Sequence, residues 1–299
     1  MFEKQTLHGA YFALTAYMFW GLVPIYFKFV DHVSPWEILG HRVLWSVFLL
    51  LGILAYTGQL HALRVNTGVM RRLVLTSILL SVNWLVFIYA IVNNNISETS
   101  LGYFINPLVT VFLGVIFLSE RLRPMQWIAI AIAGSGIAFQ IIYYGAIPWI
   151  ALTLAFSFGF YGLIRKNLNL PSVTGLALET LLILPFAILG LLWFYTSGNM
   201  NFGAVNRQTD ILLIMGGIIT SFPLLCFAAA VTRLSLTAMS IFQYIAPSLS
   251  LAIAVVMYKE PFGLDRIITF TCIWIALVIF SAETLYYHHK LSRRGAANT

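Results

Sequence analysis

The segment Tyr103-Phe104-Ile105-Asn106-Pro107 recurs 140 residues later as Gln243-Tyr244-Ile245-Ala246-Pro247. Both copies lie in long apolar runs, and at the same shift Glu120 falls on Glu260. A shift of 138 aligns the starts of the two halves and places Lys28 on Lys166. Similar composition alone does not explain a proline and a glutamate that recur at one spacing. The chain is therefore predicted to consist of two related halves, residues 1–145 and 146–299.

The composition excludes a water-soluble fold of this length. The 299 residues are 60% hydrophobic and only 9% charged, whereas a soluble domain is about 25% charged. Most of this apolar surface has to face lipid. The formal charge is +7. The positions of the basic residues along the chain indicate that this charge orients the protein in a bilayer, so no nucleic-acid partner is predicted.

Ten segments have the length of a membrane-spanning helix, which needs about 20 predominantly apolar residues. If the N-terminus lies inside, the inner segments hold twelve of the seventeen Lys and Arg residues and the outer segments hold four. This bias predicts that both chain ends are cytoplasmic. The predicted spans are 9–29, 36–56, 72–92, 99–119, 125–143, 148–164, 173–194, 211–232, 236–258 and 264–286.

Five spans per half is an odd number, so the second half must cross the membrane in the opposite direction to the first. Inverted repeats are a transporter architecture with the substrate site at the repeat interface. The predicted fold class is an all-α membrane protein with ten transmembrane helices, arranged as two inverted five-helix repeats around a central cavity. Its expected partners are the lipid bilayer and a small-molecule substrate.

Ionisable residues that are candidates for function lie inside the second and seventh predicted spans. Arg42 is the seventh residue of the second span, and an arginine at a helix centre costs about 2.5–3.5 kcal/mol. It is a candidate substrate-binding or counter-ion residue, and the alternative is an ion pair that only holds helices together. Glu179, in the matching span of the second half, is a candidate for proton coupling or for charge balance against Arg42. His41 is a second proton-coupling candidate, and Glu37 is interpreted as an interfacial residue.

Matching polar faces run along the fourth and ninth spans. Spacings of three and four residues place the members of each set on one helical face; they are Ser100, Tyr103, Asn106 and Thr110 in one span and Ser240, Gln243, Ala246 and Ser250 in the other. The alternative to a cavity lining is ordinary hydrogen bonding between membrane helices.

Substrate-binding candidates follow from these faces. They are Tyr103, Asn106, Gln243 and Tyr244, joined by Asn83 and Trp84 of the third span. Proline removes a backbone hydrogen bond and can bend a helix, which makes Pro107 and Pro247 gating candidates. Small residues in the fifth span predict close helix contact, either inside the protomer or in a homodimer; they are Ala129, Ala133, Gly134 and Gly136.

The chain contains no Walker loop, nucleophile elbow or zinc motif. Neither catalysis nor a cofactor nor a bound metal is therefore expected. The predicted function is secondary transport by alternating access, and the alternatives are a channel, a membrane-embedded enzyme that modifies lipid, and a receptor without transport. The residues alone leave the substrate, the direction and the coupling ion open.

The run Leu118-Ser119-Glu120-Arg121, followed by Gln126-Trp127 and a glycine pair at Gly134 and Gly136, resembles the EamA repeat of the drug/metabolite transporter superfamily. Within that superfamily the chain is similar to the RarD subfamily over nearly its whole length. The resembling stretches are Trp20-Gly21 with Pro24, Glu37-Ile38-Leu39 with His41-Arg42, Trp45-Ser46, Asn83-Trp84, residues 100–108, Phe160-Tyr161-Gly162, Glu179-Thr180, residues 223–227 and residues 242–245 with Pro247.

The resemblance implies a ten-helix basket with a central cavity and an inner-membrane permease that exports amino acids, metabolites or amphipathic drugs. It brings no matched substrate site, so the site residues above follow from the residues themselves. Ala246 stands where the first half has Asn106, so the two polar faces need not be equivalent.

Overall fold

The chain folds into helices throughout the computed structural model, which describes residues 2–92, 96–145, 149–168, 170–257 and 263–297. No strand occurs in those ranges. The helices are α1 (Phe2–Phe29), α2 (Pro35–Tyr56), the short 3-10 helix η1 (Leu60–Leu63), α3 (Thr67–Val92), α4 (Ile96–Leu118), α5 (Pro124–Tyr144), α6 (Trp149–Leu168), α7 (Ser172–Thr196), α8 (Arg207–Val231), α9 (Leu236–Gln243), α10 (Ile245–Val256) and α11 (Leu264–Ala297).

Helix ends fall at local signals in the sequence. Pro35 occupies the first position of α2, where a backbone N–H would have no intrahelical partner. Asn206 caps α8, because its Oδ1 accepts a hydrogen bond from the Thr209 N–H at 2.8 Å. α5 ends on Gly145, whose φ of 66° is a left-handed conformation that glycine adopts without strain.

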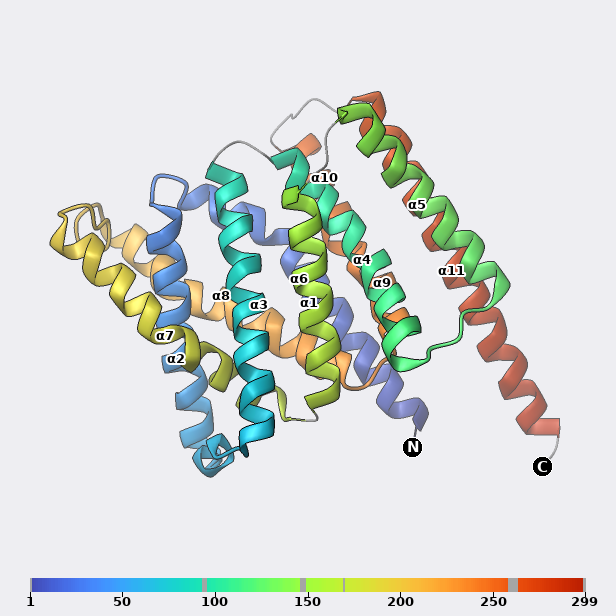
Figure 1. The fold of residues 1–299 in the computed structure, drawn as a ribbon, viewed down its shortest axis with the longest axis horizontal. Helices are drawn as coiled ribbons and strands as arrows, with labels where there is room; N and C mark the ends of the chain where they lie inside the picture. Colours follow the sequence, from blue (N-terminus) through green and yellow to red (C-terminus); the bar gives the residue numbers. More distant parts are fainter. Residues whose placement is uncertain (1, 93–95, 146–148, 169, 258–262, 298–299) are drawn as a thin grey trace.

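Eight helices in the described part of the chain are long and apolar enough to cross a membrane. α6 is not among them, and it corresponds to the shortest predicted span. In α11 the described apolar stretch, Ile267–Phe280, is shorter than the other eight. The first turn of α1 and the last turn of α11 lie at the same end of the bundle (Figure 1), as an even number of crossings requires.

The ninth predicted span is interrupted. α9 ends at Gln243 and α10 begins at Ile245. Pro247 explains the interruption, because it has no N–H to donate to the carbonyl four residues earlier, that of Gln243. Pro107 holds the same place in the first half, yet α4 runs unbroken past it. The two copies of the motif therefore differ in backbone structure.

Helices of the two halves make exchanged contacts. α2 packs against α7, and α5 runs beside α11 (Figure 1). α1 contacts α8 as α6 contacts α3, and α1 contacts α10 as α6 contacts α4. Each of these contacts therefore has a counterpart, obtained by exchanging every helix for the matching helix of the other half. Two equivalent halves are expected to show this relation.

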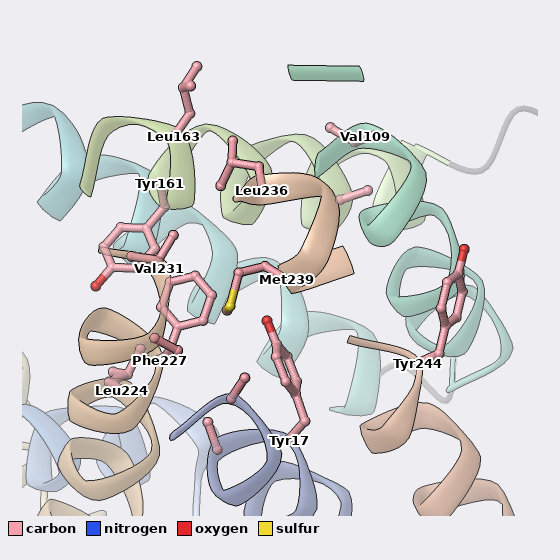
Figure 2. Close-up of a cluster of buried hydrophobic side chains, with 14 of the residues drawn as sticks. Tyr17, Val109, Tyr161, Leu163, Leu224, Phe227, Val231, Leu236, Met239 and Tyr244 are labelled. Carbon is pink, nitrogen blue, oxygen red and sulfur yellow. The ribbon is translucent and has the colours of Figure 1, made fainter. Parts of the chain in front are cut away.

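Aromatic side chains fill the interior where α1, α6 and α8 meet. The Phe227 ring lies 4.9 Å from Phe158, 5.9 Å from Tyr161 and 6.4 Å from Tyr17, measured between ring centres. Figure 2 shows the rings of Tyr17, Tyr161 and Phe227 gathered beside Met239 of α9. Tyr161 is fully buried and Tyr17 nearly so, so packing occupies both rings.

Candidate functional site

Arg42 lies among aromatic side chains and has no acidic partner among the residues that the structure describes. Its Nε donates a hydrogen bond to Thr220 Oγ1 of α8 at 2.7 Å. The guanidinium carbon lies 5.1 Å from the centre of the Trp84 ring and 5.7 Å from that of Phe27, within the range of cation–π attraction. No carboxylate among the described residues lies within 4.0 Å of Arg42. Ring faces and one hydroxyl group therefore hold this charge.

Small residues in α8 bring Arg42 to its place. A Cβ at Gly216 would lie 3.1 Å from both Arg42 Cγ and the Tyr26 hydroxyl oxygen. A Cβ at Gly217 would lie 2.6 Å from the backbone carbon of Trp45. Because neither glycine carries that atom, α2 can cross α8 closely enough for Arg42 to reach Thr220.

Trp84 contacts the Arg42 guanidinium directly, and Tyr103 lies one aromatic ring further away. The Tyr103 and Phe87 ring centres are 5.9 Å apart, Phe87 lies 5.9 Å from Phe27 in turn, and Tyr103 remains 39% exposed. Asn83 points elsewhere, because its Nδ2 donates to the Leu154 carbonyl and to Ser157 Oγ of α6, both at 3.0 Å. The structure therefore separates Asn83 from Trp84.

The predicted polar faces of the fourth and ninth spans meet each other. The Thr110 hydroxyl donates to Asn106 Oδ1 at 3.1 Å and accepts from Gln243 Nε2 at 3.1 Å. Asn106, Gln243 and Tyr244 are all buried. Hydrogen bonding between helices, one of the two interpretations of the sequence, describes this contact. The side chain of Ser100 lies outside the described part of the chain.

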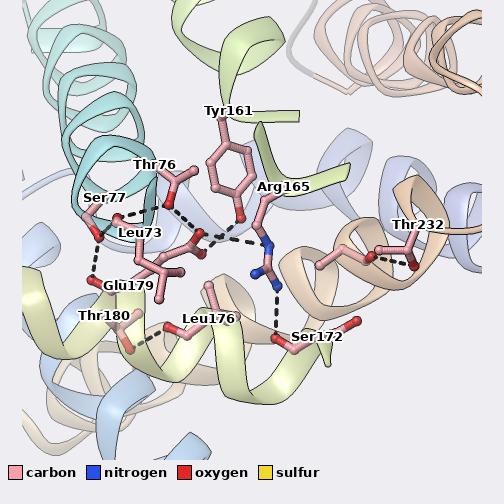
Figure 3. A network of polar contacts seen from close by, with 11 residues as sticks. Leu73, Thr76, Ser77, Tyr161, Arg165, Ser172, Leu176, Glu179, Thr180 and Thr232 are labelled. Carbon is pink, nitrogen blue, oxygen red and sulfur yellow. Dashed lines mark hydrogen bonds and ion pairs between the residues drawn. The ribbon is translucent and has the colours of Figure 1, made fainter. Parts of the chain in front are cut away.

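Glu179 is fully buried and pairs with Arg165, not with Arg42. Its Oε1 lies 3.9 Å from Arg165 Nε and accepts a hydrogen bond from Thr76 Oγ1 at 2.7 Å. Its Oε2 accepts from the Tyr161 hydroxyl at 3.3 Å. Figure 3 shows these groups converging on the carboxylate from α3 and α6. Arg165 lies just beyond the predicted sixth span, 148–164, yet it is 2% exposed inside α6.

His41 is buried with one free ring nitrogen. Its Nδ1 accepts a hydrogen bond from Trp45 Nε1 at 3.2 Å, and its Nε2 has no hydrogen-bond partner. The ring packs 4.6 Å from that of Phe202. Glu37 is buried rather than interfacial, since it accepts the N–H groups of Asn201 and Phe202, each at 2.8 Å. Sequence analysis missed this role, although an acid in the first turn of a helix is a known stabilising signal.

Glu120 and Lys166 hold the connection between α8 and α9 from two sides. Glu120 accepts the N–H groups of Leu236 and Thr237 at 2.8 and 2.9 Å. Lys166 Nζ donates to the Leu234 carbonyl at 2.5 Å and so satisfies a carbonyl just beyond the end of α8. The recurrence of a glutamate at residues 120 and 260 is the sequence signal that could have identified Glu120. Its counterpart Glu260 lies outside the described residues.

Two hollows lie on the side of α4, α5, α9 and α11. The larger has a volume of about 540 Å³ and is lined by polar side chains that include Glu120, Arg123 and Thr237. The smaller, with Pro107 and Tyr244 in its lining, has room for about 20 Å³, roughly one water molecule. Neither reaches Arg42. The described ranges contain no group of three His, Cys, Asp or Glu side chains that could hold a metal ion.

Comparison with known proteins decides the family. The sequence model of the EamA-like transporter family matches the chain twice, over residues 7–142 and 146–282. The chain belongs to the EamA-like transporter family. A Vibrio cholerae protein named "Uncharacterized transporter" is 45% identical over 297 residues, which cover 97% of both chains. "Protein RarD" of Escherichia coli K12 is 43% identical and covers 98% of this chain and 100% of its own. The resemblance to RarD is confirmed.

More distant proteins also match nearly the whole chain. "Chloramphenicol-sensitive protein RarD" of Pseudomonas aeruginosa is 27% identical over 96% of this chain and 98% of its own. A crystal structure with 17% identity superposes with a TM-score of 0.70 over 94% of this chain and 98% of that one, so the two share a fold. The chain is thus a multi-pass membrane transporter of the drug/metabolite family, with a small-molecule substrate.

Proposed function

We propose that the protein exports a small metabolite, an amino acid or an amphipathic drug across the bacterial inner membrane by alternating access. Residues 1–145 and 146–299 form two inverted five-helix repeats around the transport path, with both chain ends cytoplasmic. The observation that carries the proposal is the exchange of helix contacts between the halves. Two equivalent halves in opposite orientation have two conformations of similar energy, one open to each side.

The polar interior supplies the parts that such a carrier needs. Arg42, with Trp84 and Tyr103 around it, is the proposed substrate anchor. Asn83, Asn106, Gln243 and Tyr244 stay predictions as substrate contacts, since Asn83 and Gln243 form hydrogen bonds to neighbouring helices in this conformation. The break before Pro247 is the proposed hinge, and Pro107 marks the corresponding place in α4.

Proton coupling is proposed at Glu179 and His41. Glu179 balances the charge of Arg165, and the free Nε2 of His41 leaves that ring able to take up a proton. A pH gradient should then change the transport rate. The double variant Arg165→Met with Glu179→Gln keeps the interior neutral, so a retained pH effect in that protein would remove Glu179 from the coupling.

Flux through proteoliposomes tests the proposal. We expect saturable uptake and counterflow of an amino acid or drug from a screened panel, and loss of both in an Arg42→Ala variant that elutes as a folded protein. Single-channel conductance would support a channel instead, and product formation in detergent without any gradient would support an enzyme. Reporter fusions that place the two chain ends on opposite sides of the bilayer would contradict the inverted repeat.

A further inference from the structure

Arg42 has hydrogen-bond donors that no described residue uses. Only its Nε makes a hydrogen bond, to Thr220. The two terminal nitrogens have no partner in the described ranges, and neither is among the buried atoms that lack one. They are therefore accessible, and they present the planar fork that matches the two oxygens of a carboxylate.

The neighbours of the Arg42 guanidinium come from several helices of the bundle. Phe27 comes from α1, Trp84 from α3, Tyr103 from α4 and Thr220 from α8. With α2 itself, five helices surround the guanidinium. A group that reaches the terminal nitrogens must enter between these helices, so the acyl chains of lipid are not the natural neighbour of this charge.

The charge around Arg42 favours a ligand with a single negative charge. No described carboxylate lies within 4.0 Å of the guanidinium, and its electrostatic neighbours are the hydroxyls of Tyr26 and Tyr103. A lone charge away from water is costly unless an opposite charge pairs with it. A monoanion neutralises Arg42, whereas a phosphate monoester with two charges would leave one of them unpaired.

The neighbouring rings favour a flat apolar body on that ligand. Trp84 and Phe27 turn their faces to the guanidinium. The Tyr103 ring is 39% exposed and lies 5.9 Å from Phe87, so it offers an open aromatic face next to the charge. Offset or edge-to-face contact with a second ring is the arrangement that such a face favours.

We propose that Arg42 binds the carboxylate of a monoanionic aromatic acid, whose ring packs against Tyr103. This inference rests on the proposed transport function and names the substrate class of the same site. The terminal nitrogens of Arg42 form two parallel hydrogen bonds to the carboxylate oxygens, and the Tyr103 hydroxyl stands ready as a further donor.

Binding to the purified, full-length protein in detergent at pH 8 tests the inference. Benzoate is the probe, benzamide is its neutral counterpart, acetate lacks the ring, and phenyl phosphate carries two charges at this pH. Isothermal titration and the thermal unfolding midpoint report binding, because a ligand of the folded state raises that midpoint. We expect saturable binding of benzoate. Benzamide should bind about tenfold or more weakly, because it loses the charge-assisted hydrogen bonds. Acetate should bind more weakly because it lacks the ring contact, and phenyl phosphate because its second charge stays unpaired.

Variants assign the binding to Arg42. Arg42→Gln should abolish benzoate binding, and Arg42→Lys should weaken it because the lysine keeps the charge but loses the fork. Arg64→Gln, on an exposed connection, is the matched control and should bind benzoate normally. If Arg42→Gln fails to fold, Tyr103→Leu replaces it, and the expected result is weaker binding of benzoate with that of acetate unchanged.

Two results would overturn the inference: equal binding of benzamide and benzoate, or full benzoate binding by Arg42→Gln. Measuring flux through proteoliposomes distinguishes a failure of this inference from a failure of the proposed function. Transport of a neutral solute that survives Arg42→Gln would keep the carrier and remove the anion site. Benzoate binding at Arg42 without flux of any solute in the panel would keep the site and contradict the carrier.

Discussion

Arg165 and Glu179 form an ion pair that is closed off from solvent between α6 and α7. The Nε and Oε1 atoms lie 3.9 Å apart, and the side chains are 2% and 0% exposed. Thr76 and Tyr161 donate hydrogen bonds to the same carboxylate (Figure 3). Because these hydrogen bonds satisfy the Glu179 carboxylate, the buried ion pair is stable where either charge alone would not be.

Removal of one partner of this pair should destabilise the protein more than removal of both. Arg165→Met and Glu179→Gln should each cost about 3–5 kcal/mol, because each leaves a buried group without its partner. The double variant should lose clearly less than the sum. Thermal unfolding in detergent measures the three proteins against the wild type. Additive losses would show that the two side chains do not interact.

Glu120 should stabilise the first turn of α9. Glu120→Gln removes the charge that accepts the Leu236 and Thr237 N–H groups, and we expect a loss of about 1.5–3 kcal/mol, the contribution of a charged hydrogen bond. Hydrogen exchange at these two amides should accelerate. Glu37→Gln is the matched control, and it should accelerate exchange at Asn201 and Phe202 instead. Unchanged exchange at 236 and 237 in Glu120→Gln would contradict the role.

Pro247→Ala should join α9 to α10. The new N–H can donate to the Gln243 carbonyl, and a proline inside a helix costs about 3 kcal/mol, so we expect a more stable protein. If the break is the hinge, the transport rate should fall as stability rises. Pro107→Ala is the comparison, and its effect on the rate should be smaller because α4 is already continuous. If the two replacements change the flux equally, the break between α9 and α10 is not the hinge.

Two glycines of α5 should respond differently to alanine. A Cβ at Gly136 would lie 2.8 Å from Cys272 Cβ of α11, whereas a Cβ at Gly134 would meet nothing within 4 Å. Gly136→Ala should therefore lower the thermal midpoint by forcing α5 from α11, at a cost of about 1–3 kcal/mol. Gly134→Ala should be neutral or slightly stabilising. If both variants lower the thermal unfolding midpoint equally, Gly134 contacts a second protein molecule.

Much of the architecture follows from the sequence because its signals are local. A run of about 20 apolar residues has one low-energy structure in lipid, a helix that satisfies its own backbone. Nine predicted spans correspond to single helices, most of whose ends lie within a few residues of the prediction, while α1 begins seven residues earlier and α11 ends eleven residues later. The break at Tyr244 belongs in part to this class, since Pro247 predicts a lost hydrogen bond.

The sequence by itself determined the helices, the repeat and the presence of ionisable groups in the interior. Only the tertiary structure decided which groups meet: Glu179 with Arg165, Glu37 with the connection after α7, and Arg42 with aromatic rings instead of an acid. The physical reason is that hydropathy is a property of each segment alone, whereas a hydrogen bond or an ion pair depends on the distance and direction between two segments. A polar face has the same spacing along a helix whether it meets water, a substrate or a second polar face.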